Sequence, residues 1–283
     1  MIFDEAHHRY TINHPVWLQK KADGSGTISV TTLIHQLFPK FDEIGMATKI
    51  YSNIQRKIQT WSPEMEAAGR GPNFTVTELK YLNMSVREIT DSWEANRIQA
   101  SSLGTNFHKN VEDYLNSGGQ QYPATISTEF GYFLKFWQDL STRHPEISLY
   151  RTEWMVFDEA IGLAGSIDCV LRDNYGNLMI LDWKRSKDIK LDNRYGKGFS
   201  VFSNFDDCNW SHYQLQLNFY REILERHYQA KVVFMMNVVC HPDKESYLCY
   251  PVSHIDISAV WPYLPELARQ HQRQFDKDWQ GQH

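Results

Sequence analysis

The sequence lacks paired cysteines. Its four cysteines, at positions 169, 208, 240 and 249, form no CxxC pair, and Cys169 lies inside an apolar segment. Disulfide frameworks and structural zinc sites show paired or regularly spaced cysteines. We therefore expect buried free thiols in a reducing compartment and no iron–sulfur cluster.

Long apolar runs are also missing. No run approaches the roughly 18 residues that indicate a membrane-spanning helix, and the first residues, MIFDEAHHRY, are too polar for a signal peptide. The sequence contains no internal repeat and no low-complexity tract. These absences predict an intracellular, cytoplasmic-type protein with no membrane partner.

An excess of positive charge is absent as well. The net charge of -5 and the pI near 6.2 exclude binding of nucleic acid through bulk positive charge. They do not exclude a local basic groove, and acids clustered around a metal lower the total. With 42% hydrophobic and 14% aromatic residues, the 283-residue chain has ample material for a packed core.

Hydrophobic periodicity and turn signals predict alternating helices and strands. In the first half we expect a small sheet or hairpin over residues 8–13 and 16–20 with a turn at 23–26. One helix should begin at Ser29 and a second should cover 43–61. A loop at 67–74 should follow, and then a long helix with Ser85 and Glu88 in capping-box spacing. In the second half we expect strands at 150–157, 163–171, 178–181, 232–239 and 247–252, and helices at 210–229 and 257–279.

The segment 161–187 carries acids in apolar surroundings. Asp168 lies among apolar strand residues, Asp182 follows Met179-Ile180-Leu181, and the turn signal at 173–177 joins the two runs. Because strand side chains alternate, Asp182 and Lys184 share a face, and a hairpin brings Asp168 beside them. Two such carboxylates repel and lose hydration, which favours a divalent cation between them with the lysine behind. The alternative for Asp182 and Lys184 is an ordinary solvated sheet edge.

Two further features have functional and structural interpretations. His108 and Glu112 share a helical face, yet a histidine in a helix is also an ordinary surface or core residue. The segment 188–209 is rich in charged residues and glycine, with interleaved Phe199, Phe202 and Phe205. It could track a nucleic-acid strand or be a partly ordered surface loop. The stripe Phe130, Phe133 and Trp137 has helical spacing and predicts core.

The order of these motifs resembles the PD-(D/E)XK nuclease superfamily, and specifically its RecB-like exonuclease branch, which includes mitochondrial and phage recombination exonucleases. The resemblance covers about residues 92–250; upstream, only 29–32 matches loosely a pattern of viral and phage members. The chain lacks the cysteines of the iron–sulfur members, so it resembles a cluster-free nuclease. The matching residues are Gly104-Thr105-x-x-His108, Glu112, Glu153, Gly165-x-x-Asp168, Asp182-Trp183-Lys184 and Gln216-x-x-x-Tyr220.

The resemblance implies a role for each matching residue. Asp168 and Asp182 would bind a catalytic Mg²⁺ or Mn²⁺, with His108 and the main-chain carbonyl of Trp183 as further ligands. Lys184 would orient the attacking water or stabilise the transition state. Glu153 counts with Lys184, Asp182 and Asp168 among the catalytic residues, and Glu153 and Glu112 are candidates for holding His108 or the lysine. Gln216, Tyr220 and Arg185 would support the site or contact DNA.

We therefore expect an α/β fold with a restriction-endonuclease-like core: a central mixed β-sheet flanked by helices, with N-terminal helical additions. A single nuclease domain should comprise an N-terminal extension (1–90), the core (91–255) and a terminal helix (256–283). The expected activity is metal-dependent hydrolysis of DNA, as an exonuclease in repair, recombination or replication, with DNA and a recombination or replication protein as partners. The alternatives are an inactive nuclease-fold DNA-binding subunit and an endonuclease acting on RNA or DNA.

Overall fold

The computed structural model describes residues 2–4, 9–11, 27–62, 64, 65, 69, 71–264 and 266. The chain divides into two compact units, one formed by Met1–Pro39 with Gly104–His283 and the other by Lys40–Leu103. The long helix α6 (Val86–Asn116) contributes residues to both. The assignment of all 283 residues to one nuclease domain stays a prediction.

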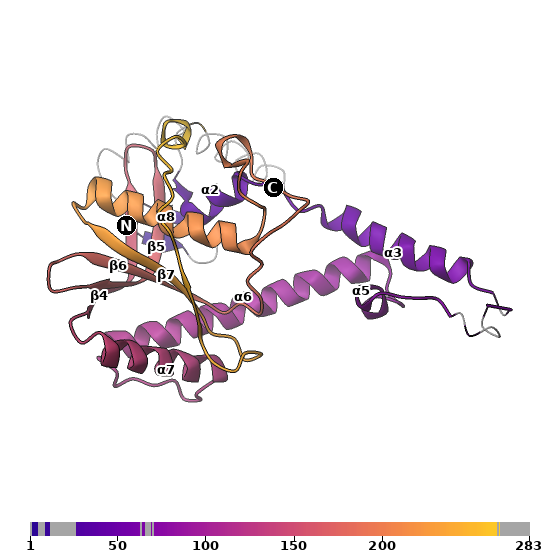
Figure 1. Ribbon diagram of the computed structural model, residues 1–283, viewed down its shortest axis with the longest axis horizontal. Coiled ribbons are helices and arrows are strands. Elements are labelled where there is room, and N and C mark those ends of the chain that lie inside the picture. The colour runs from indigo at the N-terminus through magenta and orange to yellow at the C-terminus, as the bar shows by residue number, and fades with distance from the viewer. Residues whose placement is uncertain are drawn as a thin grey trace. The chain divides into compact units, whose positions relative to one another are not determined.

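The large unit is built on a six-stranded mixed sheet, which confirms the expected α/β class (Figure 1). The strands β6 and β7 are parallel, and β5 is antiparallel to both β4 and β6. This arrangement is consistent with a restriction-endonuclease-like core. The strands are β3 (Ile28–Ser29), β4 (Ser148–Asp158), β5 (Leu163–Arg172), β6 (Leu178–Lys184), β7 (Val232–Val239) and β8 (Leu248–Pro251).

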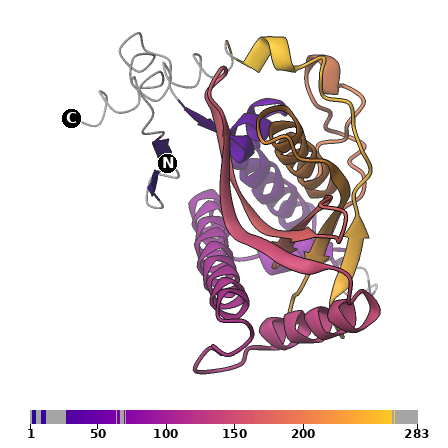
Figure 2. The ribbon, with the colours of Figure 1, turned by 90° about the vertical axis from the view of Figure 1, so that its left-hand side faces the viewer.

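Strand β5 is the centre of this sheet. It pairs along most of its length with β4, and Figure 2 shows this long pair curving together. On its other edge, β5 pairs in parallel with β3 at Leu163 and Ala164, and antiparallel with β6 from Cys169 to Arg172. The single strand therefore joins three neighbours, and the middle of β5 lies where they meet.

Helices cover both faces of the sheet, and each face has its own apolar cluster (Figure 1). The helices α2 (Val30–Gln36) and α8 (Asn209–His227) pack on one face, against residues such as Val170 and Ile180. The other face is covered by α7 (Thr128–Arg143) and residues 104–116 of α6, which enclose Trp183 and Val238. The stripe Phe130, Phe133 and Trp137 packs in this second cluster, as predicted.

The small unit is helical. It contains α3 (Glu43–Gln59), α5 (Val76–Lys80) and the first part of α6, around a core of Ala47, Ile54, Tyr81 and Ile89. The predicted capping interaction at the start of α6 is present, since Ser85 N donates to Glu88 Oε2 over 2.7 Å. The expected N-terminal helical additions are thus confirmed.

The chain ends match the sequence predictions only in part. The predicted strand at 8–13 overlaps β2 (Arg9–Thr11), which pairs with β1 (Ile2–Asp4), whereas 16–20 and 23–26 lie outside the described residues. The predicted loop at 67–74 is described at 69 and 71–74, and these residues form no helix or strand. Of the predicted terminal helix, the described part holds the short helix η2 (Trp261–Tyr263); the rest lies outside. No helix among the described residues is long and apolar enough to cross a membrane.

The cysteines are free thiols. Cys169, Cys208 and Cys240 are buried and Cys249 is exposed. Burial raises the pKa of the Cys169 thiol well above its ordinary value. The buried free thiols expected from the spacing are therefore present at three of the four positions.

Candidate metal centre

Three acids lie in a row across the middle of the sheet. Glu153 on β4 lies opposite Asp168 on β5 in the register of that pair. The β5–β6 register, which pairs Cys169 with Leu181, continues to place Asp168 opposite Asp182. We call Glu153, Asp168 and Asp182 the acid row. The predicted hairpin does bring Asp168 beside Asp182, and it adds Glu153 on the other side.

Glu153 reaches this position through an unusual backbone conformation. Its φ of 41° lies in the left-handed region, which a residue with a side chain adopts at an energetic cost. Ser166 Oγ donates a hydrogen bond of 2.8 Å to Glu153 Oε2. A strained residue held by a neighbouring donor indicates that the surrounding strands fix the direction of this carboxylate.

His108 approaches the acid row from helix α6. Its Nδ1 atom lies 3.5 Å from Asp168 Oδ2, a separation typical of an ion pair rather than a good hydrogen bond. The main-chain N–H of Trp183 donates to the same Asp168 oxygen over 2.8 Å. His108 from α6 and the main-chain N–H of Trp183 on β6 thus contact the same oxygen of Asp168.

The site passes a simple test for holding a metal ion. One ligand atom each from His108, Glu153 and Asp168 lie within 4.8 Å of one another, which suits the ligand distances of about 2.0–2.6 Å around a divalent ion. An imidazole with two carboxylates is a common donor set for Mn²⁺ and also accepts Mg²⁺. The group therefore fits a divalent cation.

This set differs from the set that the resemblance implied. The group includes Glu153 and not Asp182, whose Oδ2 lies 2.7 Å from Lys184 Nζ. Asp182 as a metal ligand stays a prediction. The lysine lies off the direction of a regular hydrogen bond, so the contact is chiefly electrostatic and this buried oxygen keeps capacity for another partner. The indole of Trp183 is buried on the α7 face. Its carbonyl as a metal ligand stays a prediction.

Side chains of helix α8 contact the Lys184 ammonium. Its Nζ donates to Gln216 Oε1 over 3.0 Å, and Gln216 Nε2 donates to the hydroxyl of Tyr220 over 3.2 Å. The ring of Tyr213 lies 4.5 Å from Nζ. Sequence reasoning missed Tyr213, although its position three residues before Gln216 places the two on one helical face. Gln216 and Tyr220 thus connect to the acid row through the lysine.

Burial and mutual repulsion change the pKa values of the acid row. Burial and the charge of Asp168 raise the pKa of Glu153 to about 7. Burial raises the pKa of Asp182 to about 6, although Lys184 acts in the opposite direction. Burial alone would raise the pKa of Asp168, but His108 and Lys184 keep it below its ordinary value. Carboxylates that are brought together out of water disfavour each other's ionisation, and a cation among them would relieve that repulsion.

The two bases respond to the same acids. Burial would lower the pKa of His108, but Asp168 outweighs it and raises the pKa to about 9. Burial likewise disfavours the charged form of Lys184, and Asp182 and Asp168 together raise its pKa. Before a metal enters, protonated His108 therefore balances the Asp168 charge.

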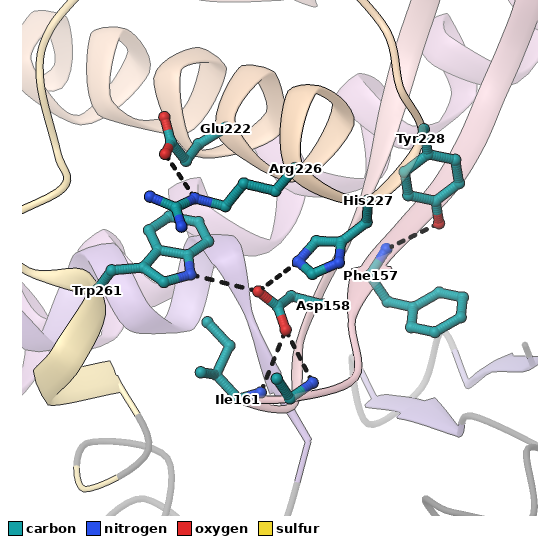
Figure 3. Close-up of polar contacts among 9 residues, drawn as sticks. Phe157, Asp158, Ile161, Glu222, Arg226, His227, Tyr228 and Trp261 are labelled. Carbon is teal, nitrogen blue, oxygen red and sulfur yellow. Dashed lines mark hydrogen bonds and ion pairs between the residues drawn. The ribbon is translucent and has the colours of Figure 1, made fainter.

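A second buried acid shows what a purely structural carboxylate looks like (Figure 3). Asp158 Oδ2 accepts from His227 Nε2 at 2.7 Å and from the Trp261 indole at 3.3 Å, and Oδ1 accepts from the main-chain N–H groups of Ala160 and Ile161. Oδ2 thus ties the end of β4 to α8 and η2, and Oδ1 ties it to the turn that follows. The acid row differs because its carboxylates face one another.

Two predicted supporting residues lie in different surroundings. Glu112 is 3.5 Å from Lys109 and its charge contributes to the raised pKa of Glu153, so it lies near the acid row. Arg185 Nε instead donates to Glu129 Oε1 at 2.8 Å, and both side chains are nearly buried. This pair holds the start of α7, and it lowers the pKa of Glu129 despite burial.

The segment 188–209 has both buried and exposed side chains. Phe202 is buried in the α8-side cluster, and Lys197 pairs with Asp206. Phe199 and Tyr195 are exposed. The segment is thus anchored to the core at Phe202 and Phe205, while its role in tracking nucleic acid stays a prediction.

Comparisons with known proteins add little to this geometry. No protein-family model matches the chain, and no curated protein matches it significantly. Among solved structures it is similar to SSO0001, with 13% identity and a TM-score of 0.31 over 93% of this chain and 87% of that one. It is also similar to a protein named "Putative exonuclease" from Eubacterium rectale, with 12% identity and a TM-score of 0.34 over 93% and 83%. Such TM-scores do not establish a shared fold.

Proposed function

We propose that this protein is a metal-dependent nuclease that hydrolyses phosphodiester bonds of DNA, acting from an end. The observation that carries the proposal is the convergence of His108, Glu153 and Asp168 on one point, with Asp182 and Lys184 beside it. Carboxylates and an imidazole that can hold a divalent cation, with an ammonium beside them, suit the hydrolysis of a phosphate diester.

Each residue has a distinct part in this proposal. His108, Glu153 and Asp168 would hold Mg²⁺ or Mn²⁺, which when bound lowers the pKa of a water and neutralises charge on the scissile phosphate. Asp182 holds the Lys184 ammonium at the edge of the acid row, where it can pair with a phosphate oxygen or orient the attacking water. Gln216 and Tyr220 keep the lysine in place. One face of strand β6 therefore supplies both the Asp182 carboxylate and the Lys184 ammonium.

Cleavage assays with matched variants test the proposal. The purified protein should cut end-labelled DNA in Mn²⁺ or Mg²⁺, and Lys184→Met should lower the rate by about 100-fold or more, the scale for removing one preorganised electrostatic group. Because Lys184 is outside the three-ligand group, this variant should still bind Mn²⁺, whereas Asp168→Asn should not. Normal cutting by Lys184→Met, or no cutting of single-stranded and duplex DNA by the wild type, contradicts the mechanism.

The rival function is a DNA-binding subunit that keeps this fold without catalysis, in a recombination or packaging complex. The acid row argues against it, because repelling buried carboxylates cost stability unless a cation uses them. Calorimetric titration separates the two: Mn²⁺ binding that depends on Asp168 supports the enzyme, and its absence supports the subunit.

The mode of cleavage needs its own comparison. Substrates with free and blocked ends separate an exonuclease from an endonuclease, and matched RNA and DNA strands separate the two nucleic acids. The proposal expects DNA with a free end to be cut fastest. Repair, recombination and replication are the settings in which such an activity is used.

A further inference from the structure

The ring of Tyr213 faces the ammonium of Lys184. Their separation of 4.5 Å from Nζ to the ring centroid lies within the range of a cation–π contact. Tyr213 and Gln216 are three residues apart on α8, so one helical face presents both to the lysine. None of the proposed catalytic roles above uses this ring.

The contacts of Lys184 show what the ring contributes. A lysine ammonium has three donors and no acceptor. One contact is a directional hydrogen bond, to Gln216 Oε1 at 3.0 Å, and a second is the ion pair with Asp182 Oδ2 at 2.7 Å. The face of an aromatic ring attracts the remaining charge without fixing the direction of any one N–H bond. An ammonium held in this way can turn a donor toward an incoming phosphate oxygen.

The burial of the lysine makes such a contact effective. The Lys184 side chain is only 15% exposed, and cation–π attraction strengthens when the cation is removed from water. A flexible four-carbon side chain also needs confinement if its charge is to meet a substrate at a fixed point. The Tyr213 ring adds a third contact to those with Asp182 and Gln216 and so supplies part of that confinement.

We propose that Tyr213 is a positioning residue whose ring face, and not its hydroxyl, holds the Lys184 ammonium where a phosphodiester oxygen arrives. The inference rests on the proposed nuclease function and deepens it. It assigns a part to a residue outside the Gln216 and Tyr220 pair. This role does not need the Tyr213 hydroxyl, but it does need the electron density on the ring face.

A graded ring series provides the test. Tyr213→Phe should keep the wild-type kcat, and replacing that Phe by its 4-fluoro, 3,5-difluoro and 3,4,5-trifluoro forms should lower kcat stepwise, by about tenfold in total. Fluorine withdraws density from the ring face while nearly preserving its volume. KM should stay constant, because the ring acts on the lysine rather than on the substrate.

Phe219 offers a matched control on the same helix. It is buried in the α8-side cluster and stacks on Trp261 at 6.0 Å between ring centroids. The same fluorinated residues at position 219 should leave kcat unchanged. A stepwise fall there as well would indicate a general packing effect and overturn the inference.

A second measurement does not depend on activity. The Lys184 ε-methylene protons should show an upfield NMR shift from the ring current, kept in Tyr213→Phe and lost in Tyr213→Leu. If the wild type cuts DNA but kcat is equal across the fluorinated series, the inference fails alone. A large loss in Tyr213→Phe assigns the effect to the hydroxyl and also overturns it. A wild type that does not cut DNA overturns the proposed function and this inference together.

Discussion

Gly165 and Tyr220 are in such close approach that a Cβ atom at position 165 would lie 2.5 Å from Tyr220 Cε1 and 3.1 Å from its hydroxyl. The Gly165→Ala variant must therefore displace the Tyr220 ring. Overpacking of this kind costs about 1–3 kcal/mol of unfolding free energy, and the displaced ring takes Gln216 with it. We expect lower stability by urea unfolding together with a reduced cleavage rate.

Gly104 serves as the control for this substitution. Among the described residues, nothing lies within 4 Å of a Cβ built there, and Gly104 is inside α6. Gly104→Ala should stabilise the protein by about 0.5–1 kcal/mol, because alanine favours the helix. If the two alanine substitutions change the unfolding free energy and the cleavage rate equally, the contact between Gly165 and Tyr220 is not the cause of the change.

Glu153 has a strained backbone and is also a proposed metal ligand. Replacing it should therefore raise stability while weakening metal binding. In Glu153→Gly, the φ of 41° no longer carries a penalty of about 1–3 kcal/mol, and a buried carboxylate is removed. We expect a higher midpoint of thermal unfolding and weaker Mn²⁺ binding by calorimetry.

Glu153→Gln is the comparison for that variant. It keeps the strained backbone and removes only the charge, so it should bind Mn²⁺ as weakly as Glu153→Gly while gaining less stability. The interpretation is wrong if the glutamine variant is the more stable of the two.

Asn237 is a buried amide whose two polar atoms have no hydrogen-bond partner among the described residues. It is paired with Asp182 in the β6–β7 register. Leaving such a group unpaired costs about 1–3 kcal/mol, so Asn237→Leu should raise the free energy of unfolding by about 1 kcal/mol in metal-free protein. Denaturant unfolding measures the change.

Asn218 is equally buried but fully bonded. Its Nδ2 donates to the carbonyls of Gln214 and Ser253, and its Oδ1 accepts from Ile255 N at 2.8 Å. Asn218→Leu should therefore destabilise the protein by about 2–4 kcal/mol, because three backbone groups lose a partner. The free energy of unfolding should therefore fall in Asn218→Leu and rise in Asn237→Leu. A loss of stability in both variants would show that Asn237 has a hydrogen-bond partner in solution.

Divalent-ion binding should depend on pH with a definite sign. The pKa of His108 is raised to about 9 and that of Glu153 to about 7, so both hold protons near neutral pH. A metal ion must displace those protons. The apparent Mn²⁺ affinity should therefore rise as the pH increases through about 7, where Glu153 loses its proton, to about 9, where His108 does. Calorimetry at pH 7 in buffers of different ionisation enthalpy should record proton release.

His108→Gln identifies the source of these protons. The variant should release fewer protons per Mn²⁺ bound, and its affinity should depend less on pH. Affinity that is independent of pH in the wild type would contradict the ligand assignment.

Local sequence signals predicted most of the fold. The run Val232–Val239 is a strand with those bounds, and Ser29 caps α2 by accepting from Thr32 N. Strand β6, by contrast, extends beyond the predicted 178–181 through Lys184. Its polar end has no apolar pattern, and pairing with β7 holds it in the sheet.

The sequence by itself determined which residues are proposed for the site, because motif order and strand alternation place Asp182 and Lys184 on one face and a turn returns Asp168 to them. Only the tertiary structure decided which of these side chains lie together. The β4–β5 register and the left-handed backbone at Glu153 bring that carboxylate to His108 and Asp168, while the lysine takes Asp182. Helix α8 adds Tyr213. Such choices depend on distances between segments far apart in the chain, which local periodicity does not encode.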